Sequence, residues 1–253
     1  VGAGDCLALL DDEGHPLAAL RVAERWERDR RAEAQAVFGT TSLEHPGVRS
    51  MLEAGHPWLL AGDLEVLRPP THYDFPDLRL APRATRAAFA ARGWSSVLAF
   101  QTRNPMHRAH LELTMRGMAE SGASLLVHPV VGVTRDGDVS HYARVRCYRA
   151  LMPRYPPGAA MLSLLPLAMR MAGPREAVWH AIIRRNYGCS HFIVGRDHAG
   201  PGRDSAGRWF YDPLEAQDLV RRHADELGIT MVPFRDMVYV PSVDRCLPED
   251  EVP

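Results

Sequence analysis

Hydrophobic positions in the first 75 residues fall in short runs that are separated by polar turns. Two such runs flank an Asp-Asp-Glu-Gly turn within residues 6–22, a pattern typical of a β-hairpin. Gly62 divides the apolar stretch of residues 58–66 in a similar way, and we expect a second pair of strands there. Residues 26–37 carry many charges and predict a solvated helix or connector. Residues 1–75 are therefore expected to form a β-rich domain.

From residue 76 to residue 233, continuous apolar runs alternate with segments of helical period, after a linker marked by Pro69, Pro70 and Pro76. Such alternation predicts an α/β fold with a doubly wound parallel sheet, and residues 234–253 would begin a C-terminal segment. The expected strands are residues 96–100, 124–131, 160–165, 191–194 and 229–232. The expected helices include residues 85–92, 173–188 and 212–228.

A polar loop follows the expected strand of residues 96–100. Its sequence over residues 101–110, Gln-Thr-Arg-Asn-Pro-Met-His-Arg-Ala-His, combines two imidazoles, guanidinium groups and main-chain amides. We expect a helix to start near Pro105, since a proline at the first helical position loses no hydrogen bond. His107 and His110 would then share one face of its first turn. Free N–H groups and the helix dipole favour anions there, so the loop predicts a pocket for a polyphosphate.

A second polar loop, Gly-Arg-Asp-His-Ala-Gly-Pro-Gly over residues 195–202, follows the expected strand of residues 191–194. In doubly wound sheets, ligands bind beyond the carboxyl ends of the strands, at the point where the strand order reverses. Both polar loops leave such strand ends. We therefore expect the two loops to face one crevice.

The overall charge limits the partners that this chain can attract. The sequence has 253 residues, a formal net charge of −1, 46% hydrophobic residues and 24% charged residues. This is the composition of an ordinary globular protein, and it provides no global basic field for nucleic acid or an anionic membrane. No apolar run approaches the roughly 18 residues that a membrane-spanning helix needs. Any anion site must therefore be a local concentration of Arg and His.

The four cysteines are widely spaced, at positions 6, 147, 189 and 246. They form no Cys-x-x-Cys pair and no Cys/His ligand spacing, which argues against a structural zinc site. Free thiols without a signal peptide indicate a cytoplasmic protein.

Three motifs, in the same order along the chain, resemble those of ATP sulfurylases within the His-x-x-His nucleotidyltransferase group. They are the two polar loops and the stretch Leu-Pro-Leu-Ala-Met-Arg-Met-Ala-Gly-Pro-Arg-Glu-Ala over residues 165–177. The resemblance extends from about residue 37 to residue 241. It implies a Rossmann-like nucleotidyltransferase domain that is preceded by a partial PUA-like β domain. Relative to that family, both ends of the chain are short, so we expect a fragment of a longer protein.

The resemblance implies a reaction in which ATP and sulfate form adenylyl sulfate and pyrophosphate. In the family pattern, Gln101, Arg103 and the Ala199 N–H group bind sulfate. Thr102, Arg103 and Asn104 match the triplet that is assigned as catalytic. Sulfate is already ionised, so a general base has no proton to remove. Catalysis would have to come from positioning and charge stabilisation.

The same resemblance assigns contacts to the nucleotide. His107 and His110 would act catalytically by holding the β- and γ-phosphates and stabilising the charge that grows on pyrophosphate. Arg196 would also act catalytically, by contacting the α-phosphate, where the charge of the transition state concentrates. Adenine would lie near Gly195 and Met237. The expected ATP-binding set comprises Gln101, Thr102, Arg103, Asn104, His107, His110, Gly195, Arg196, Asp197, His198 and Met237.

We expect no metal ion that is held by protein ligands at this site. Residues 101–110 contain no carboxylate, and the second loop offers only Asp197. Mg²⁺ prefers oxygen ligands, to which the two histidines are poorly suited. Magnesium should therefore arrive as MgATP. The resemblance further implies a homo-oligomer and an adenylylsulfate kinase, either fused to this protein or separate from it.

Three other interpretations of the whole chain stay open. The first is adenylyl or cytidylyl transfer to a different acceptor, because the His-x-x-His core is shared across the superfamily. The second is a nucleotide-sensing domain without catalysis. The third, an RNA-binding PUA-like module, lacks the basic surface that it would need.

Alternatives also stay open at single residues. Asp197 could cap its loop or orient Arg196, and His198 could be structural or form a wall of the adenine pocket. Arg108 is expected to be solvated. Residues 134–136 read Thr-Arg-Asp where the family commonly has Thr-Lys-Pro, which changes the rigidity expected of that loop.

Overall fold

The computed structural model describes residues 1–132, 137–234 and 236–252, so the substituted loop at residues 134–136 lies outside the described residues. The chain divides into two compact units, Val1–Pro76 and Asp77–Pro253. Within the described residues, no helix has both the length and the hydrophobicity that crossing a bilayer requires.

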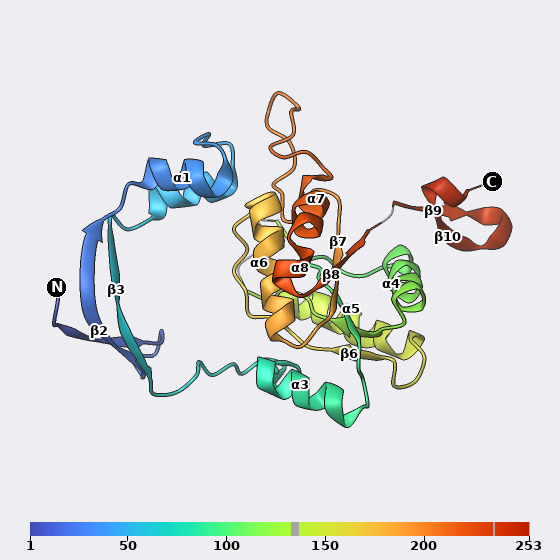
Figure 1. The fold of residues 1–253 in the computed structure, drawn as a ribbon, viewed down its shortest axis with the longest axis horizontal. Helices are drawn as coiled ribbons and strands as arrows, with labels where there is room; N and C mark the ends of the chain where they lie inside the picture. Colours follow the sequence, from blue (N-terminus) through green and yellow to red (C-terminus); the bar gives the residue numbers. More distant parts are fainter. Residues whose placement is uncertain (133–136, 235, 253) are drawn as a thin grey trace. The chain divides into compact units, whose positions relative to one another are not determined.

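The first unit contains a three-stranded antiparallel sheet, whose two long strands run side by side (Figure 1). The predicted hairpin is confirmed, since β1 (Cys6–Leu10) pairs with β2 (Pro16–Glu27) around the acidic turn. The third strand, β3 (Trp58–Val66), pairs with the other edge of β2. The strand order is therefore β1-β2-β3.

The prediction of a strand pair around Gly62 was wrong, because β3 runs through this residue without turning. Gly62 lies opposite Val22, next to a shift of register between Val22 and Glu24. A side-chain carbon on Gly62 would lie 1.9 Å from the carbonyl oxygen of Arg21. The glycine therefore permits a close backbone approach at a bulge, which is the other common reason for a glycine within a strand.

The charged segment between β2 and β3 forms a helix, α1 (Arg30–Phe38). The Asp29 carboxylate caps its start by accepting a hydrogen bond from the Ala32 N–H at 2.9 Å. Two short helices follow, α2 (Pro46–Arg49) and η1 (Ser50–Ala54).

The second unit contains the predicted parallel sheet, with five strands in the order β6-β5-β4-β7-β8. The order reverses between β4 and β7, which are neighbours although two other strands separate them in sequence. All residues of β4 are buried, as a strand covered on both faces should be. The strands are β4 (Val97–Phe100), β5 (Ser124–Val127), β6 (Ala160–Leu162), β7 (His191–Val194) and β8 (Thr230–Pro233).

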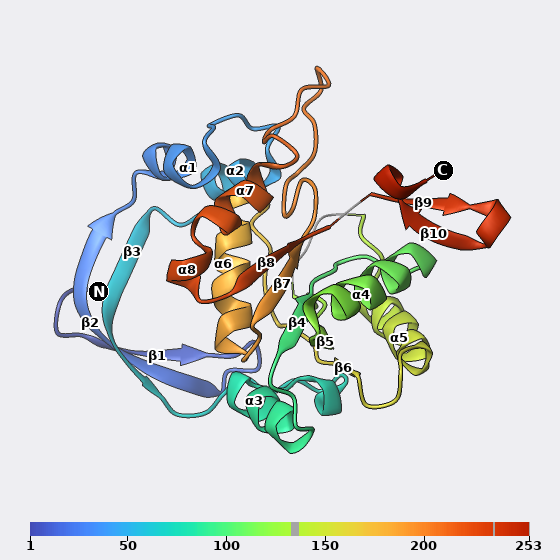
Figure 2. The ribbon, with the colours of Figure 1, turned by 45° about the vertical axis from the view of Figure 1, so that its right-hand side comes forward.

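Helices cover both faces of this sheet (Figure 2). One face carries α4 (Arg108–Ser121) and α5 (His141–Leu151). The other carries α6 (Gly173–Asn186), whose Ala177 and Ala181 pack against Phe192 in the main hydrophobic core. The helices α3 (Pro82–Ala91), α7 (Glu215–Arg222) and α8 (Ala224–Leu227) contribute to that same core. Single-turn segments lie at η2 (Pro76–Leu78), η3 (Met152–Arg154), η4 (Pro241–Val243) and η5 (Glu249–Glu251).

The last helix of the sheet domain differs from its prediction. One helix was expected over residues 212–228, whereas the chain forms α7 and α8, which meet at His223. The backbone of His223 leaves the helical region at φ −101° and ψ 10°. At the start, the Asp212 carboxylate accepts the Leu214 N–H at 2.9 Å and forms a turn, so the helix begins only at Glu215.

After β8 the chain forms a hairpin that the sequence pattern did not reveal, β9 (Met237–Val240) with β10 (Arg245–Pro248). This hairpin contacts α4. The Arg108 guanidinium donates to Asp244, and the Cys246 N–H donates to the carboxylate of Glu112 at 3.0 Å. Arg108 was expected to be solvated, and this was wrong in part: its side chain is half exposed but bound to the hairpin.

Candidate active site

The two polar loops leave adjacent strands, at the point where the strand order reverses. Leu98 of β4 pairs with His191 of β7, and Ala99 pairs with Phe192. Both strands run in the same direction, so their carboxyl ends lie at one edge of the sheet. Figure 2 shows this arrangement, with α4 and α6 on opposite sides of the two strands.

The first loop is held in shape by Thr102, which is 9% exposed. The Asn104 N–H donates to the Thr102 hydroxyl at 3.1 Å. The same hydroxyl donates to the Asn104 carbonyl oxygen, also at 3.1 Å. The Tyr148 hydroxyl also donates to this carbonyl, at 2.7 Å. Thr102 therefore fixes a tight turn, and the exposed Asn104 side chain is carried by that turn.

Arg103 is anchored through both its backbone and its side chain. The buried Arg144 donates to the Arg103 carbonyl at 2.9 Å and to the Val130 carbonyl at 2.9 Å. The Arg103 guanidinium lies 2.5 Å from a carboxylate oxygen of Asp138. The Oε1 atom of Gln101 is buried and accepts no hydrogen bond within the described part of the chain. An unpaired amide beside an arginine is a candidate ligand contact.

His107 and His110 are close together, but they do not share the first helical turn. The helix α4 begins at Arg108, and His107 is its N-cap with extended backbone angles of φ −127° and ψ −178°. The predicted start near Pro105 was therefore wrong. The His107 N–H donates to Nδ1 of His110 at 3.3 Å, and the two ring centroids are 4.0 Å apart. This capping box pairs an N–H group that would otherwise be unpaired at the start of the helix. The helix therefore starts after His107 and not at Pro105.

The electrostatics of His110 follow from this cap. Burial, together with the neighbouring His107, lowers the pKa of His110 to about 4, so this imidazole is neutral at pH 7. A main-chain N–H can only donate, so Nδ1 of His110 is the unprotonated nitrogen and Nε2 carries the hydrogen. His110 thus offers a neutral N–H donor rather than a positive charge.

Unusual backbone angles mark the second loop. Asp197 and Ala199 both have positive φ, at 45° and 56°, which non-glycine residues rarely adopt. The Gly200 N–H donates to the Asp197 carbonyl at 2.9 Å, and a side-chain carbon on Gly200 would lie 1.8 Å from the Asp197 carboxylate. Burial raises the pKa of Asp197, and nearby Arg103 opposes this effect. Asp197 therefore folds back beneath its own loop.

Arg196 is paired with Asp236, not with Asp197. Its guanidinium lies 2.5 Å from the Asp236 carboxylate, and both side chains are about half exposed. This pairing raises the pKa of Arg196. The pairing also brings Asp236 to the second loop. Asp236 directly precedes Met237, the first residue of β9.

His198 contacts a second buried histidine beneath the loop. Its Nε2 lies 3.0 Å from Nδ1 of His180 on α6, and its Nδ1 accepts the Gly195 N–H at 3.4 Å. Burial lowers the pKa of His198 to about 3. These contacts favour a structural position for His198. The sequence reasoning missed His180, Glu176, Asp138 and Asp236; the only signal for Glu176 was its place in the motif of residues 165–177.

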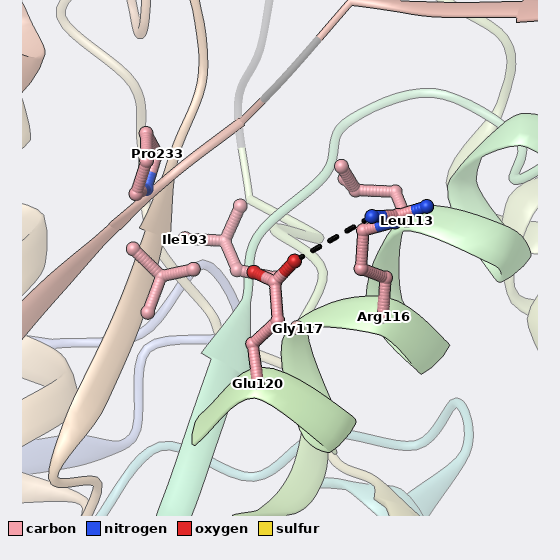
Figure 3. Close-up of a pocket in the computed structure, with 7 residues that line it drawn as sticks. Leu113, Arg116, Gly117, Glu120, Ile193 and Pro233 are labelled. Atoms are coloured by element: carbon pink, nitrogen blue, oxygen red, sulfur yellow. Dashed lines mark ion pairs between the residues drawn. The ribbon is translucent and has the colours of Figure 1, made fainter. Parts of the chain in front are cut away.

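A small pocket lies along the later turns of α4, against β7 and β8. Figure 3 shows Arg116 and Glu120 as an ion pair beside this pocket, with 3.7 Å between the charged atoms. Its volume of about 10 Å³ leaves room for roughly one water molecule, so it does not hold a nucleotide. The lining residues are Leu113, Arg116, Gly117, Glu120, Ile193, Val232 and Pro233.

Metal-ligand geometry occurs elsewhere in the described residues. Asp11, Glu13 and His15, on the turn between β1 and β2, are the one group of three or more His, Cys, Asp or Glu residues there with ligand atoms within 4.8 Å of one another. Exposed acidic groups of this kind are common without a metal ion. His107 and His110 belong to no such group among the described residues.

Known proteins match both units of the chain. A family model described as ATP-sulfurylase matches residues 76–252, and one described as a PUA-like domain matches residues 1–69. The chain is 52% identical to a sulfate adenylyltransferase of Mycosarcoma maydis over 250 residues, which cover 98% of this chain and 44% of that protein. It is 52% identical to one of Schizosaccharomyces pombe over 252 residues, covering 99% of this chain and 51% of that protein.

A solved structure extends the similarity to the fold. The chain aligns with a structure described as the hexameric APS kinase from Thiobacillus denitrificans with a TM-score of 0.76 and 32% sequence identity. The alignment covers 100% of this chain and 42% of that chain. This chain spans about half the length of the curated relatives that it matches.

Proposed function

We propose, from the premise that this chain belongs to the ATP-sulfurylase family, that the whole protein is a sulfate adenylyltransferase. It would convert ATP and sulfate to adenylyl sulfate and pyrophosphate, reversibly. The observation that carries the proposal is the meeting of two loops at the switch point of the sheet, each with residues suited to anions.

The reaction needs positioning more than proton transfer. Sulfate would attack the α-phosphorus, the P–O bond to pyrophosphate would break, and no proton would have to leave the nucleophile. The site therefore needs groups that hold sulfate and the triphosphate in line and that stabilise the charge growing on pyrophosphate. It needs no general base. The site residues support this, because they are arginines, histidines, amides and main-chain N–H groups.

Gln101, Arg103 and the Ala199 N–H group would hold sulfate. The buried, unpaired amide oxygen of Gln101 supports this role, because a half-turn of the amide would direct its N–H₂ group to the same place. The planar guanidinium of Arg103 suits an oxyanion. Sulfate would then compete with Asp138 for Arg103.

The nucleotide phosphates would bind at the start of α4 and at Arg196. His107 and His110 would contact the β- and γ-phosphates, with His110 donating from Nε2. Arg196 would exchange its Asp236 partner for the α-phosphate, where the charge of the transition state collects. Thr102 and Asn104 would keep the first loop in place between the two substrates.

The adenosine end of the nucleotide would follow the second loop. Gly195, Asp197, His198 and Met237 would lie along this part of ATP. The backbone of this loop is fixed by the contacts of Asp197 and His198 described above.

Magnesium would enter as part of the substrate, MgATP. Two of the carboxylates at this edge are already engaged, Asp138 with Arg103 and Asp236 with Arg196. Mg²⁺ can take its oxygen ligands from phosphates and water in such a site. The arginine side chains and the N–H donors would be the protein's own contribution.

Two partner proposals depend on the relatives. A solved neighbour is described as a hexameric APS kinase. We expect that adenylyl sulfate made here is passed to an adenylylsulfate kinase, either fused or separate, and that the full protein is a homo-oligomer.

The test is pyrophosphate release by the full-length protein with MgATP and a panel of acceptors. We expect turnover with sulfate, or with molybdate as its mimic, and none with a phosphate monoester. Equal turnover with an unrelated acceptor and none with sulfate would reject the proposal. Nucleotide binding without any turnover would indicate a sensor.

A further inference from the structure

Two strained loops lie against each other at the candidate site. One contains Met171 with φ 61°, and the other contains Asp197 and Ala199 with φ 45° and 56°. They are joined directly, since the Gly173 N–H donates to the Ala199 carbonyl at 3.1 Å. Non-glycine residues keep such angles only where their surroundings fix them. The surroundings of these loops therefore have to supply that constraint.

A continuous line of polar contacts runs beneath both loops. The carboxylate of Glu176 accepts the N–H groups of Arg170 and Ala172, each at 2.9 Å. The same carboxylate lies 3.3 Å from Nε2 of His180, which makes no hydrogen bond within the described residues. Nδ1 of His180 lies 3.0 Å from Nε2 of His198.

The line ends at the main chain of the second loop, where Nδ1 of His198 accepts the Gly195 N–H at 3.4 Å. This contact determines which nitrogen of each imidazole carries the hydrogen, because a main-chain N–H can only donate. Nδ1 of His198 is then unprotonated, so its Nε2 carries the hydrogen and donates to Nδ1 of His180. His180 in turn carries its hydrogen on Nε2, which faces Glu176.

Both imidazoles have to be neutral for this direction to hold. Burial, together with the nearby Arg184 guanidinium, lowers the pKa of His180 well below its ordinary value. Burial, His180 and Arg184 lower the pKa of His198, and Glu176 opposes them. His180 and Arg184 are fully buried on α6, so the positive charge of Arg184 stays close to both rings.

We infer that His180 and His198 form a hydrogen-bonded pair of fixed direction that positions the second loop, with His180 as the central positioning residue and its Nε2–H facing the Glu176 carboxylate. The role in turnover rests on the proposed function, because this loop carries Arg196 and the Ala199 N–H group. His180 touches no substrate in this scheme. It acts by holding His198, and through His198 the Gly195 N–H.

The first experiment measures this pair itself and needs no activity. Nitrogen-15 NMR of the imidazoles in the full-length protein distinguishes the two neutral tautomers. We expect His180 and His198 to be neutral Nε2–H tautomers at pH 7, with the Gly195 amide protected from hydrogen exchange. An Nδ1–H tautomer of His198, or a charged His180, would overturn the inference.

The second experiment uses substitutions of His180. His180→Leu keeps the volume and removes both nitrogens, whereas His180→Asn keeps an acceptor close to the position of Nδ1. We expect His180→Leu to speed exchange of the Gly195 amide and to lower kcat by about tenfold to a hundredfold, the scale of a small misplacement. The KM for ATP should change little, and His180→Asn should recover most of kcat.

Val178→Ala is the matched control, because it shortens a partly buried side chain of the same helix that packs on the core. It should lower the melting temperature without changing the Gly195 exchange or kcat. If Val178→Ala lowers kcat as much as His180→Leu, or if His180→Asn is as slow as His180→Leu, His180 has no positioning role. Absent sulfate-dependent turnover in the wild type would reject the proposed function and leave the NMR result standing.

Discussion

His107 and His110 each have two functions in the proposed site. His107 is the N-cap of α4, in a capping box whose side-chain half an alanine would remove. His110 accepts the His107 N–H on Nδ1 while keeping Nε2–H available. A substitution therefore combines a structural effect with the loss of a phosphate contact. Separating the two effects requires a residue that caps a helix but has no imidazole.

Asparagine is such a residue, because it is among the favoured N-caps. We predict that His107→Asn retains the fold and stability while turnover falls by about 10²–10³, the loss expected for one preorganised donor. His107→Ala should lose the same rate and, in addition, about 1 kcal/mol of stability as a missing cap. Steady-state kinetics and urea unfolding of the two variants measure these quantities.

His110→Ala should also lower turnover by about 10²–10³. If folded His107→Asn or His110→Ala turns over at the wild-type rate, the replaced histidine serves only to cap the helix. Arg116, on the same helix and paired with Glu251, serves as a control that should not affect the rate when replaced by Gln.

The residues that we propose to bind anions were chosen from the sequence, but the side chains that pair with them could not be. Arg103 and Arg196 were identified from motif positions. The carboxylates that hold them, Asp138 and Asp236, lie 35 and 40 residues farther along the chain. Such pairs depend on how distant loops fold, and no local pattern carries that information.

At the level of elements, the buried strands were the most predictable feature. Short apolar runs bounded by polar loops predicted β4, β5, β6, β7 and β8, although the expected strands over residues 124–131 and 160–165 end earlier, at Val127 and Leu162. Two other errors concern a helix start and a turn. His107 displaced the start of α4 from Pro105. The hairpin of β9 and β10 turns through residues 241–244, which contain no glycine to mark a turn.

Gly62 is the element-scale case that can be tested. We predict that Gly62→Ala destabilises the unit Val1–Pro76 by about 1–3 kcal/mol, the usual cost of forcing atoms into a filled space. The reason is the close approach of the Arg21 carbonyl oxygen. Hydrogen exchange of the amides in β2 and β3 would report the change.

Gly2→Ala is the control, because an added carbon there meets nothing within 4 Å. It should leave the exchange of the same amides unchanged. Normal protection of β2 and β3 in Gly62→Ala would show that the bulge tolerates a side chain, contrary to the geometry.

At the scale of the second unit, Asp77–Pro253, several histidines are buried in the neutral form. The pKa values of His110, His128, His180 and His198 are all lowered, with burial as the first cause. The unfolded chain would protonate them near pH 6.5 and so binds more protons than the folded chain below that pH. Folding stability should then fall as the pH drops from 6.5 toward 4, and it is fully present above 6.5.

We predict a loss of up to about 1.4 kcal/mol per pH unit for each such histidine between pH 6.5 and 5.5, where most carboxylates do not titrate. Glu176 and Asp197, whose pKa values are raised, oppose part of this loss. Urea unfolding at pH 7.5, 6.5 and 5.5 tests the slope. His128→Phe should make the slope shallower, and equal stability at all three pH values would contradict the assignment.

The topology of this unit has a consequence for its synthesis. The pairing of β4 with β7 joins Leu98 to His191, about 90 residues later in the chain. At roughly 5–20 residues per second, a ribosome needs several seconds or more to supply the second strand. During that time β4 can pair with β5 on one side, but its other edge is open. An apolar strand with an open edge can pair with strands of other chains. Nascent protein should therefore depend on a chaperone most strongly before residue 191 emerges. A ribosome stalled in this interval would expose an aggregation-prone intermediate.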